Sequence, residues 1–447
     1  MGLLDRLRGT SAPRVAVIGV DGLPYSVVAD NPGVFENLHA IADEGAGGAI
    51  ESAVPPAESA TWPALTAGVN PGKTGVYGFT DREVGTYDTY VPMGGDVQAD
   101  RIWDRATAAG RDATVLNVPV TFPPQRDVQR MVSSYLARDL ESAAYPDELR
   151  EYLLSIDYRL DDDPELGHEA DKTAFVDDAD ETVARRFEAF RHYVEADDWD
   201  LFVGAITTSD RVNHFLFGDY ARGGEYREAF LDFYREVDRY VGELHDLLGD
   251  DVTTVVASDH GFTGLEYEVH CNQWLREEGW LSFREEPREL ADIADGARAF
   301  ALSPGRFYLN LEGREPRGAV PEAEYESVRA ELRAAIEGLE DPDGEPVVER
   351  VVTREEAFNG PHDDIAPDLV ALPRRGYDLQ GVFGTDAPTF GSGARTGTHT
   401  LGDATLVVDD PGVRIEGDVN IYDIAPTVLD LLDIDYDVGA FDGRSLA

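Results

Sequence analysis

The chain has 447 residues and a formal charge of −50, because 88 aspartates and glutamates stand against 38 lysines and arginines. A chain this acidic repels nucleic acid duplexes and anionic membrane surfaces, so we expect neither as a partner. Hydrophobic residues make up 42% of the sequence and aromatic residues 10%, which is enough for a large core and excludes a disordered acidic tail.

The positive charge is nearly all arginine, since Lys73 and Lys172 are the only lysines. This composition favours a folded, halophilic protein whose surface is adapted to concentrated salt, where screening removes the self-repulsion. Cys271 is the only cysteine, so we expect no intramolecular disulfide and no cysteine-based zinc cluster. The first residues show neither a signal-peptide pattern nor a membrane-spanning one, and we expect a soluble, cytoplasmic protein.

Short apolar runs alternate with amphipathic stretches along the chain, which is typical of a mostly parallel sheet covered by helices. The predicted fold class is therefore α/β. We predict strands at Arg14–Val20, Ala49–Ala53, Ala113–Leu116, Leu201–Ile206, Val252–Ala257 and Ala404–Val408. We predict helices at Val34–Glu44, Trp62–Ala67, Asp180–Val194, Tyr226–Leu248 and Ile421–Leu432.

Two regions interrupt this alternation. Residues 139–180 are very acidic and weakly periodic, and we interpret them as a solvated excursion rather than a cation site, because charge runs usually face water. Residues 264–396 have their own predicted strands and helix: Arg306–Leu311, Val347–Val352, Asp368–Leu372 and Glu322–Gly338. We predict a discontinuous core of residues 14–263 and 397–446, with residues 264–396 inserted as a smaller cap.

Potential metal ligands stand beside four of the predicted strands. In an open α/β sheet the carboxyl ends of the strands form the functional crevice. Each residue alone has a plainer explanation, such as a turn, a surface pair or a structural histidine. Together they provide the nitrogen and oxygen ligands for two adjacent divalent metals. They are Asp21, Asp210, His214, Asp259, His260 and His399.

The segment Pro55–Gly68 has the pattern of a proline-rich loop that enters a short helix. Thr61 stands where an N-cap is expected, with Pro63 at an early helical position, and its simplest role is to cap the helix. The alternative is a nucleophile whose hydroxyl lies at the positive end of a helix and against a metal. The helix end and the metal would each stabilise an alkoxide on Thr61.

These motifs, taken in order, resemble the alkaline phosphatase superfamily. The most similar branch is the type I phosphodiesterase/nucleotide pyrophosphatase family, and within it the predicted phosphohydrolases and phosphomutases of prokaryotes. The resemblance covers residues 14–446 and implies a three-layer α/β/α sandwich with a smaller inserted cap. The motifs are Asp21, Thr61-Trp62-Pro63-Ala64, Asp210 with His214, Ser258–Gly261 and Gly397–His399, supported by Val69–Lys73, Asn117–Pro119, Tyr308–Pro316 and Ile421–Thr427.

The resemblance also implies roles for these residues. Asp210, His214 and His399 would hold one divalent metal, and Asp21, Asp259 and His260 the other, with Thr61 at or between the two. The ions implied are Zn²⁺, with Mn²⁺ or another divalent ion as the alternative. Thr61 would attack the phosphorus of a small phosphoester, and water would hydrolyse the phospho-threonine with overall retention of configuration.

The chain departs from the family pattern at Ala64, where nucleotide pyrophosphatases often have an Asn that donates to a phosphoryl oxygen. Backbone N–H groups near Thr61 or another side chain must then substitute. A phosphodiesterase is the function that we favour. A phosphatase, phosphomutase or phosphonate hydrolase of the same superfamily is the alternative. A metal-stabilised binding protein is the non-enzyme alternative, against which the presence of Thr61 argues.

Three further residues are predicted to bind substrate. Lys73 could contact phosphate or simply belong to the turn at Asn70-Pro71-Gly72. Arg211 could bind phosphate with two hydrogen bonds or pair with one of the many carboxylates. Asn117 could line the pocket or form a turn after its strand.

Overall fold

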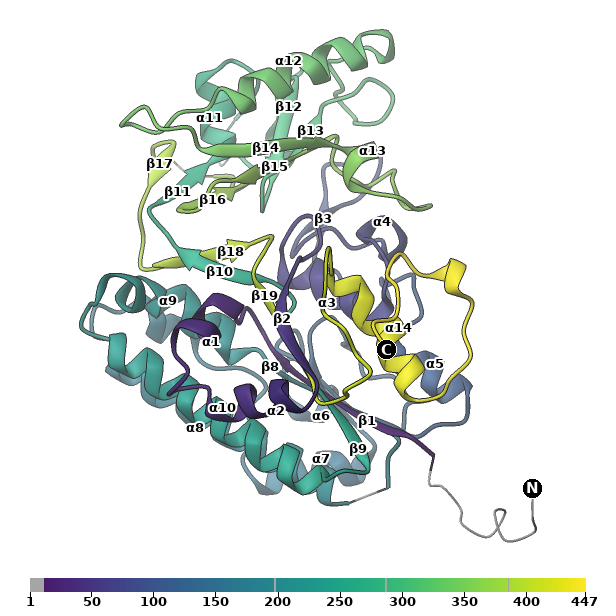
Figure 1. Ribbon diagram of the computed structural model, residues 1–447. Coiled ribbons are helices and arrows are strands. Elements are labelled where there is room, and N and C mark those ends of the chain that lie inside the picture. Colours follow the sequence, from purple (N-terminus) through teal and green to yellow (C-terminus); the bar gives the residue numbers. More distant parts are fainter. Residues whose placement is uncertain (1–11, 197, 286–287, 385) are drawn as a thin grey trace, which may run out of the picture.

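The computed structural model describes residues 12–196, 198–285, 288–384 and 386–447. Eight strands of this part form the large sheet, in the order β2-β19-β9-β1-β8-β5-β6-β7 (Figure 1). The five strands from β9 to β6 are parallel, whereas β19, β2 and β7 each run antiparallel to their neighbours. The bounds are β1 (Arg14–Val20), β2 (Ala46–Ile50), β5 (Ala113–Val118), β6 (Arg130–Ser133), β7 (Ala144–Tyr145), β8 (Leu201–Ile206), β9 (Val252–Ala257) and β19 (Ala404–Val408).

Helices cover both faces of this sheet. The side chains of strand β1 are therefore buried on both sides: Ala16 and Ile18 belong to one hydrophobic core, and Val15 and Val17 belong to the other. A central parallel strand buried on both faces needs such a continuous apolar run. One face packs against α1 (Tyr25–Asp30), α2 (Glu36–Glu44), α7 (Asp147–Ser155), α8 (Thr173–Glu195), α9 (Thr208–Arg222) and α10 (Arg227–Leu248). The other packs against α3 (Glu58–Ala67), α5 (Ile102–Ala108) and α14 (Ile424–Leu431).

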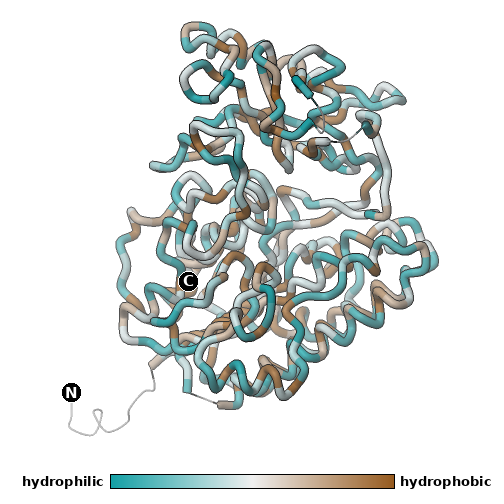
Figure 2. The backbone as a smooth tube through the Cα atoms, turned by 180° about the vertical axis from the view of Figure 1, so that it is seen from behind, coloured by the Kyte–Doolittle hydropathy of each residue, from teal (hydrophilic) through white to brown (hydrophobic). Residues whose placement is uncertain are grey.

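The three-layer α/β/α sandwich expected from the sequence is thus confirmed. The long helices are amphipathic, as the alternation of hydrophilic and hydrophobic residues in Figure 2 shows. In α10 the buried positions Phe230, Phe233, Val237, Val241 and Leu244 recur with nearly the helical period, which places them on one face.

A second sheet, with its own hydrophobic core, lies beyond one edge of the large one (Figure 1). Its four strands have the order β12-β13-β15-β14, and α11 (Cys271–Glu277) and α12 (Tyr325–Glu337) pack against it. The strands are β12 (Ala299–Leu302), β13 (Arg306–Leu309), β14 (Val348–Thr353) and β15 (Leu369–Pro373). The exact limits of a cap at residues 264 and 396 stay a prediction.

Smaller sheets join the two large ones. Strands β10 (Gly261–Gly264) and β18 (Gly397–Thr400) pair antiparallel, and β11 (Tyr267–His270) pairs with β16 (Tyr377–Gln380) and β17 (Phe390–Gly391). The remaining elements are α4 (Pro71–Thr74), β3 (Asp81–Arg82), β4 (Thr89–Tyr90), α6 (Leu140–Ala143), α13 (Arg354–Ala357) and the 3₁₀ turns η1 (Pro164–His168), η2 (Leu290–Asp292), η3 (Glu322–Glu324), η4 (Ile421–Asp423) and η5 (Val438–Ala440). Within the described residues, no helix is both long and apolar enough to cross a bilayer.

Two sequence predictions need correction. The strand predicted at Ala49–Ala53 is β2 at Ala46–Ile50, because the backbone of Ala46, Gly47 and Gly48 pairs with β19 despite its low strand propensity. Most acidic side chains of residues 139–180 face water, as predicted, but the segment is not an irregular excursion. Its residues form α6, β7, α7 and the start of α8, and the Asp162 side chain is only 4% exposed. The apolar residues of these short elements belong to the hydrophobic core on the α8 face of the large sheet.

Candidate metal centre and active site

The predicted ligands lie at the carboxyl ends of three adjacent strands. In the order β9-β1-β8, these strands lead directly to Asp259 and His260, to Asp21, and to Asp210 in the first turn of α9. The fourth segment arrives through β18, where His399 pairs with Phe262 of β10. The sheet topology therefore gathers ligands that lie as far apart as residues 21 and 399.

Two glycines allow the local geometry around Asp21. A Cβ on Gly19 would lie 2.2 Å from the Trp62 ring, so the glycine lets this tryptophan pack closely on β1. Trp62 Nε1 then donates to Asp21 Oδ2 at 2.9 Å. Gly22 has a φ of 64°, which glycine adopts at little cost, and this confirms the turn expected after the strand.

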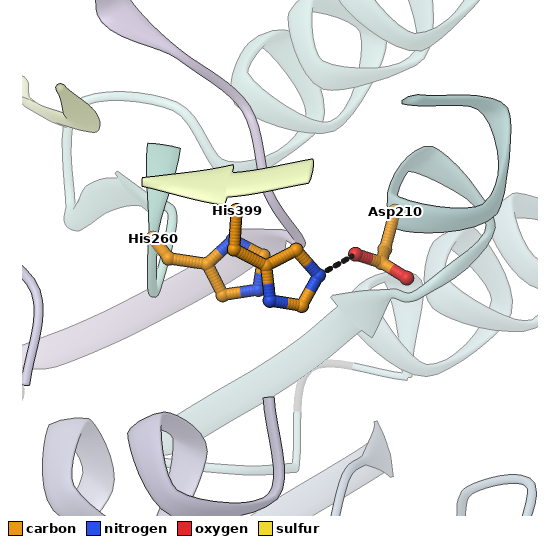
Figure 3. Close-up of side chains that lie close together, drawn as sticks. All are labelled: Asp210, His260 and His399. Atoms are coloured by element: carbon orange, nitrogen blue, oxygen red, sulfur yellow. Dashed lines mark hydrogen bonds and ion pairs between the residues drawn. The ribbon is translucent and has the colours of Figure 1, made fainter. Parts of the chain in front are cut away.

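Asp210, His214 and His399 are the three predicted ligands of one metal and are called here the first ligand group, and His260 also lies with Asp210 and His399 in a cluster that could hold a metal ion. His399 Nε2 lies 3.1 Å from Asp210 Oδ1 and 3.1 Å from His214 Nε2. His214 Nε2 lies 3.6 Å from Asp210 Oδ2. The His260 ring stacks on that of His399, with centroids 3.9 Å apart, so the two ligand groups are neighbours (Figure 3).

All three histidines have the same hydrogen-bonding arrangement. Each Nδ1 lies against a backbone carbonyl: His214 at 3.1 Å from Gly397 O, His260 at 3.2 Å from Gly261 O and His399 at 2.9 Å from Pro56 O. A carbonyl only accepts hydrogen bonds, so each neutral ring carries its proton on Nδ1 and turns the Nε2 lone pair to the centre. Metal-binding histidines are oriented in this way.

Asp21, Asp259 and His260 form the second group, and all three are fully buried. His260 Nε2 lies 3.5 Å from both Asp21 Oδ1 and Asp259 Oδ2. Within the described residues, Asp21 Oδ1 and His260 Nε2 have no hydrogen-bond partner. Unpartnered buried polar atoms are costly, and a divalent cation between them removes that cost. The donor set fits Zn²⁺ or a similar ion.

The charges around both groups also favour a bound cation. Burial, followed by the neighbouring Asp259, raises the pKa of Asp21 well above its usual range. Burial lowers the pKa of His214 to about 3, which keeps this ring neutral and its lone pair free. Although burial opposes it, the contacts with His214 and His399 hold the pKa of Asp210 well below its usual range.

Thr61 lies beside the second group, fully buried, with Oγ1 donating to Asp259 Oδ2 at 2.5 Å. The predicted N-cap role of Thr61 is wrong. Helix α3 begins at Glu58 with Ala57 as its N-cap, and Thr61 is the fourth helical residue. The Thr61 N–H donates to the Ala57 carbonyl at 2.9 Å, as the N–H of a residue inside a helix does. This contact outweighs the local capping preference, and Pro63 consequently lies inside the helix.

The first turn of α3 offers backbone donors next to Thr61. Within the described residues, the N–H groups of Glu58 and Ser59 donate no hydrogen bond, as expected at a helix N-terminus. Ala64, two residues beyond Trp62, is fully buried in the hydrophobic core of the second face.

Glu58 was not predicted as a site residue. Burial, followed by the charges of Asp210 and Asp259, raises the pKa of Glu58 to about 8, although Arg211 opposes the rise. The only sequence signal was an acidic residue three positions before Thr61. Asp161 was also missed, and its Oδ2 lies 3.5 Å from Arg211 Nη2.

The three residues predicted to bind substrate lie in different surroundings. Arg211 is beside the first group, with Nη1 3.8 Å from Asp210 Oδ2. The Lys73 ammonium pairs with Asp442 at 2.6 Å. Asn117 is fully buried with a φ of 64°, and its amide lies 3.3 Å from the hydroxyls of Thr207 and Tyr158. The structure thus places Arg211 beside the predicted ligands. Lys73 and Asn117 instead interact with other residues of the chain.

The comparisons agree with this geometry. A family model described as type I phosphodiesterase / nucleotide pyrophosphatase matches residues 15–400. Among solved structures, phosphonoacetate hydrolase from Sinorhizobium meliloti 1021, in complex with phosphonoacetate, is 17% identical with a TM-score of 0.62, and the alignment covers 94% of this chain and 96% of that chain. Murine ectonucleotide pyrophosphatase / phosphodiesterase 5 in complex with AMP is 14% identical with a TM-score of 0.56, and 97% of each chain is covered.

The human ectonucleotide pyrophosphatase / phosphodiesterase 5 is 13% identical with a TM-score of 0.57, and again 97% of each chain is covered. At these identities the solved structures establish a shared fold. A search of curated proteins found no match.

Proposed function

The chain belongs to the type I phosphodiesterase / nucleotide pyrophosphatase family of the alkaline phosphatase superfamily, and from this premise we propose a mechanism with two divalent metals and Thr61 as nucleophile. The protein is a metal-dependent phosphoester hydrolase of the phosphodiesterase type. The substrate that we propose is a small phosphodiester, and the metals are Zn²⁺ or Mn²⁺.

The proposal rests mainly on the hydrogen bond between Thr61 and Asp259. The only hydroxyl that donates to a carboxylate of the second ligand group, within the described residues, is that of Thr61, at 2.5 Å from Asp259 Oδ2. Thr61 is fully buried and lies in the first turn of α3, where the helix dipole favours negative charge. A threonine that merely stabilised the helix would need no carboxylate partner.

The residues of the chain divide the reaction between them. Asp210, His214 and His399 would hold one ion, and Asp21, Asp259 and His260 the other. Ions held there would supply Lewis-acid stabilisation of the attacking and leaving oxygens. Thr61 Oγ forms a bond to phosphorus as the bond to the leaving alcohol breaks, and water then cleaves the phospho-threonine and restores the hydroxyl.

The phosphoryl oxygens also need donors, and Ala64 offers none. The free N–H groups of Glu58 and Ser59 support the proposal that the first turn of α3 takes this role. Arg211 is the side chain that we propose beside them, since its guanidinium lies against Asp210 and its buried Nε has no partner among the described residues. The pairing of Lys73 with Asp442 and the burial of Asn117 give these two predicted residues less support.

We further propose that the protein works in concentrated salt, such as the cytoplasm of a cell that accumulates salt. An excess of 50 acidic charges with only two lysines supports this proposal. We also keep residues 264–396 as the proposed cap, because the cavity beside His399 is lined both by this region and by residues 55–59 at the start of α3.

The test is hydrolysis of bis-p-nitrophenyl phosphate and p-nitrophenyl phosphate in concentrated KCl with Zn²⁺ or Mn²⁺. We expect metal-dependent turnover with a preference for the diester, and its loss in Thr61→Ala. A preference for the monoester would indicate a phosphatase or phosphomutase. Turnover that persists in Thr61→Ala would contradict the nucleophile, and metal binding without turnover of either ester would favour the binding-protein alternative.

A further inference from the structure

A cavity of about 280 Å³ opens beside the first ligand group, and His214 and His399 form part of its wall. Residues 55–59 line it on the side of the large sheet, and residues 303–305, 371–373 and 377–380 line it on the side of the second sheet. Its volume is at the lower end for small-molecule sites. It has room for one small organic group next to a phosphoryl group on the metals.

Most of the wall of this cavity is apolar. Its largest exposed side chain is Phe79, which is 51% exposed although nearly all other phenylalanines are buried or half-buried. A large aromatic side chain exposed beside catalytic ligands is a contact surface for a ligand. The other apolar residues of the wall are Pro55, Pro56, Ala57, Pro304, Ala371, Leu372, Pro373 and Leu379.

Arg306 holds two walls of the cavity together. This arginine is fully buried. Its Nη2 donates to Thr80 O at 2.6 Å, and its Nη1 pairs with Asp81, so it fixes the segment that follows Phe79. Its Nε donates to Ser303 O at 2.9 Å, which fixes the turn on the opposite wall.

Gly78 completes this arrangement. A Cβ at Gly78 would lie 2.6 Å from Arg306 Nη2, so only glycine lets the backbone before Phe79 pass the guanidinium. The position of the Phe79 ring is therefore set by buried contacts rather than by its own packing.

We propose that this cavity binds an aromatic or similarly flat apolar group attached to the substrate phosphorus, and that Phe79 determines this specificity, with Arg306 as its positioning residue. The inference rests on the proposed function, because the phosphoryl group must lie on the metals for its substituent to reach Phe79. At the polar end of the cavity, Arg395 pairs with both Asp378 and Glu268, and Gln380 donates to Asp378 at 2.5 Å. The guanidinium is therefore already paired with carboxylates and is not a free cation for an anionic substituent.

Calorimetric titration tests this proposal without turnover. Phenylphosphonate and methylphosphonate are titrated into the Zn²⁺-loaded protein in concentrated KCl, because both present the same phosphonate and only one carries a ring. We expect the wild type to bind phenylphosphonate more tightly. In Phe79→Ala this preference should fall about tenfold, which corresponds to one aromatic contact, and Phe79→Leu should lie between the two.

Leu154→Ala is the matched control, because Leu154 is 49% exposed on α7 and does not line the cavity. It should keep the full preference. Equal affinities for the two phosphonates in the wild type, or an unchanged preference in Phe79→Ala, would overturn the inference. Hydrolysis of bis-p-nitrophenyl phosphate by the same samples separates the two claims. A preference that depends on Phe79 without any hydrolysis supports the cavity and contradicts the proposed function, and hydrolysis without such a preference does the reverse.

Discussion

His214 Nε2 and His399 Nε2 lie 3.1 Å apart, and the other nitrogen of each ring faces a backbone carbonyl. The Nε2 atoms of the two rings therefore face each other, and a cation between them would be bound by both lone pairs. The buried carboxylate of Asp210, 3.1 Å from His399, adds the negative charge that such a cation requires. This pair of histidines supports the proposal of a metal beside Asp210.

Loss of one histidine ligand should therefore remove one ion. We expect two Zn²⁺ per chain in the wild type after dialysis and one in His399→Ala, measured by plasma mass spectrometry. His192→Ala is the control, because His192 is exposed and stacks only on tyrosines. Two ions retained in His399→Ala would remove this residue from the ligand set.

Thr61→Ala should lower kcat by at least about 1000-fold, since removal of a nucleophile leaves only binding and electrostatic stabilisation. Thr61→Ser should retain much of the rate, because it keeps the hydroxyl. Thr66→Ala is the matched control: Thr66 is buried on the same helix, and its hydroxyl bonds to Trp62 O at 2.7 Å. Steady-state hydrolysis of bis-p-nitrophenyl phosphate checks all three, and similar rates in Thr61→Ala and Thr66→Ala would be incompatible with a Thr61 nucleophile.

Arg306→Met should destabilise the fold by about 3–5 kcal/mol, because it leaves the buried Asp81 without its charged partner. Burial already raises the pKa of Asp81, and Arg306 opposes this rise. Arg235→Met removes an exposed ion pair with Asp232 and should cost less than about 0.5 kcal/mol. Urea unfolding in concentrated KCl measures both, and equal costs would mean that Arg306 is not a key contact.

The pH dependence of stability should reveal Asp162. Burial, followed by the charge of Asp161, raises the pKa of Asp162 to about 8, whereas an unfolded aspartate titrates near about 3.9. The folded state therefore binds the proton more strongly, so its contribution to stability is full below pH ~4 and is lost as pH rises through about 8.

Asp162→Asn stays neutral and should not lose this stability. We expect the variant to gain on the wild type by a few kcal/mol, in order of magnitude, between about pH 4 and about pH 8. Asp147→Asn, at an exposed residue of α7, is the control and should follow the wild type. Urea midpoints across this range decide the matter, and parallel curves for Asp162→Asn and the wild type would show that this carboxyl ionises as it does in water.

Salt should stabilise the protein strongly. The excess of 50 negative charges repels itself in dilute buffer, and screening at molar KCl shortens the Debye length to about 3 Å. The Tm should therefore rise steadily from dilute to concentrated KCl, and a Tm independent of salt would contradict the proposed adaptation.

Much of this arrangement could be predicted because strands of parallel sheets are continuous apolar runs. The bounds of β1, β8, β9 and β19 match the sequence predictions, and the ligands at their ends follow from the topology. Features that depend on tertiary contacts could not be predicted. Helix α3 begins at Glu58 and overrides the capping preference of Thr61. The burial of Asp162, in an otherwise exposed acidic segment, is also invisible in the sequence pattern.

In the candidate site, too, some residues could be predicted from the sequence and others depend on tertiary contacts. The six predicted ligands could be chosen from their positions beside strands. The place of Glu58 beside Thr61 could not, because it depends on where α3 begins. The role of Phe79 was also hidden, since it depends on the buried contacts of Arg306 with residues more than 200 positions away in the sequence.

The most direct test of the central claim is to look for phosphate on Thr61. The metal-loaded protein is mixed with bis-p-nitrophenyl phosphate in concentrated KCl and quenched in acid within one turnover, and its peptides are analysed by mass spectrometry. The account predicts a phosphoryl adduct on Thr61 in the wild type and none anywhere in Thr61→Ala. Rapid hydrolysis by the wild type with an unmodified Thr61 at every quench time would contradict it.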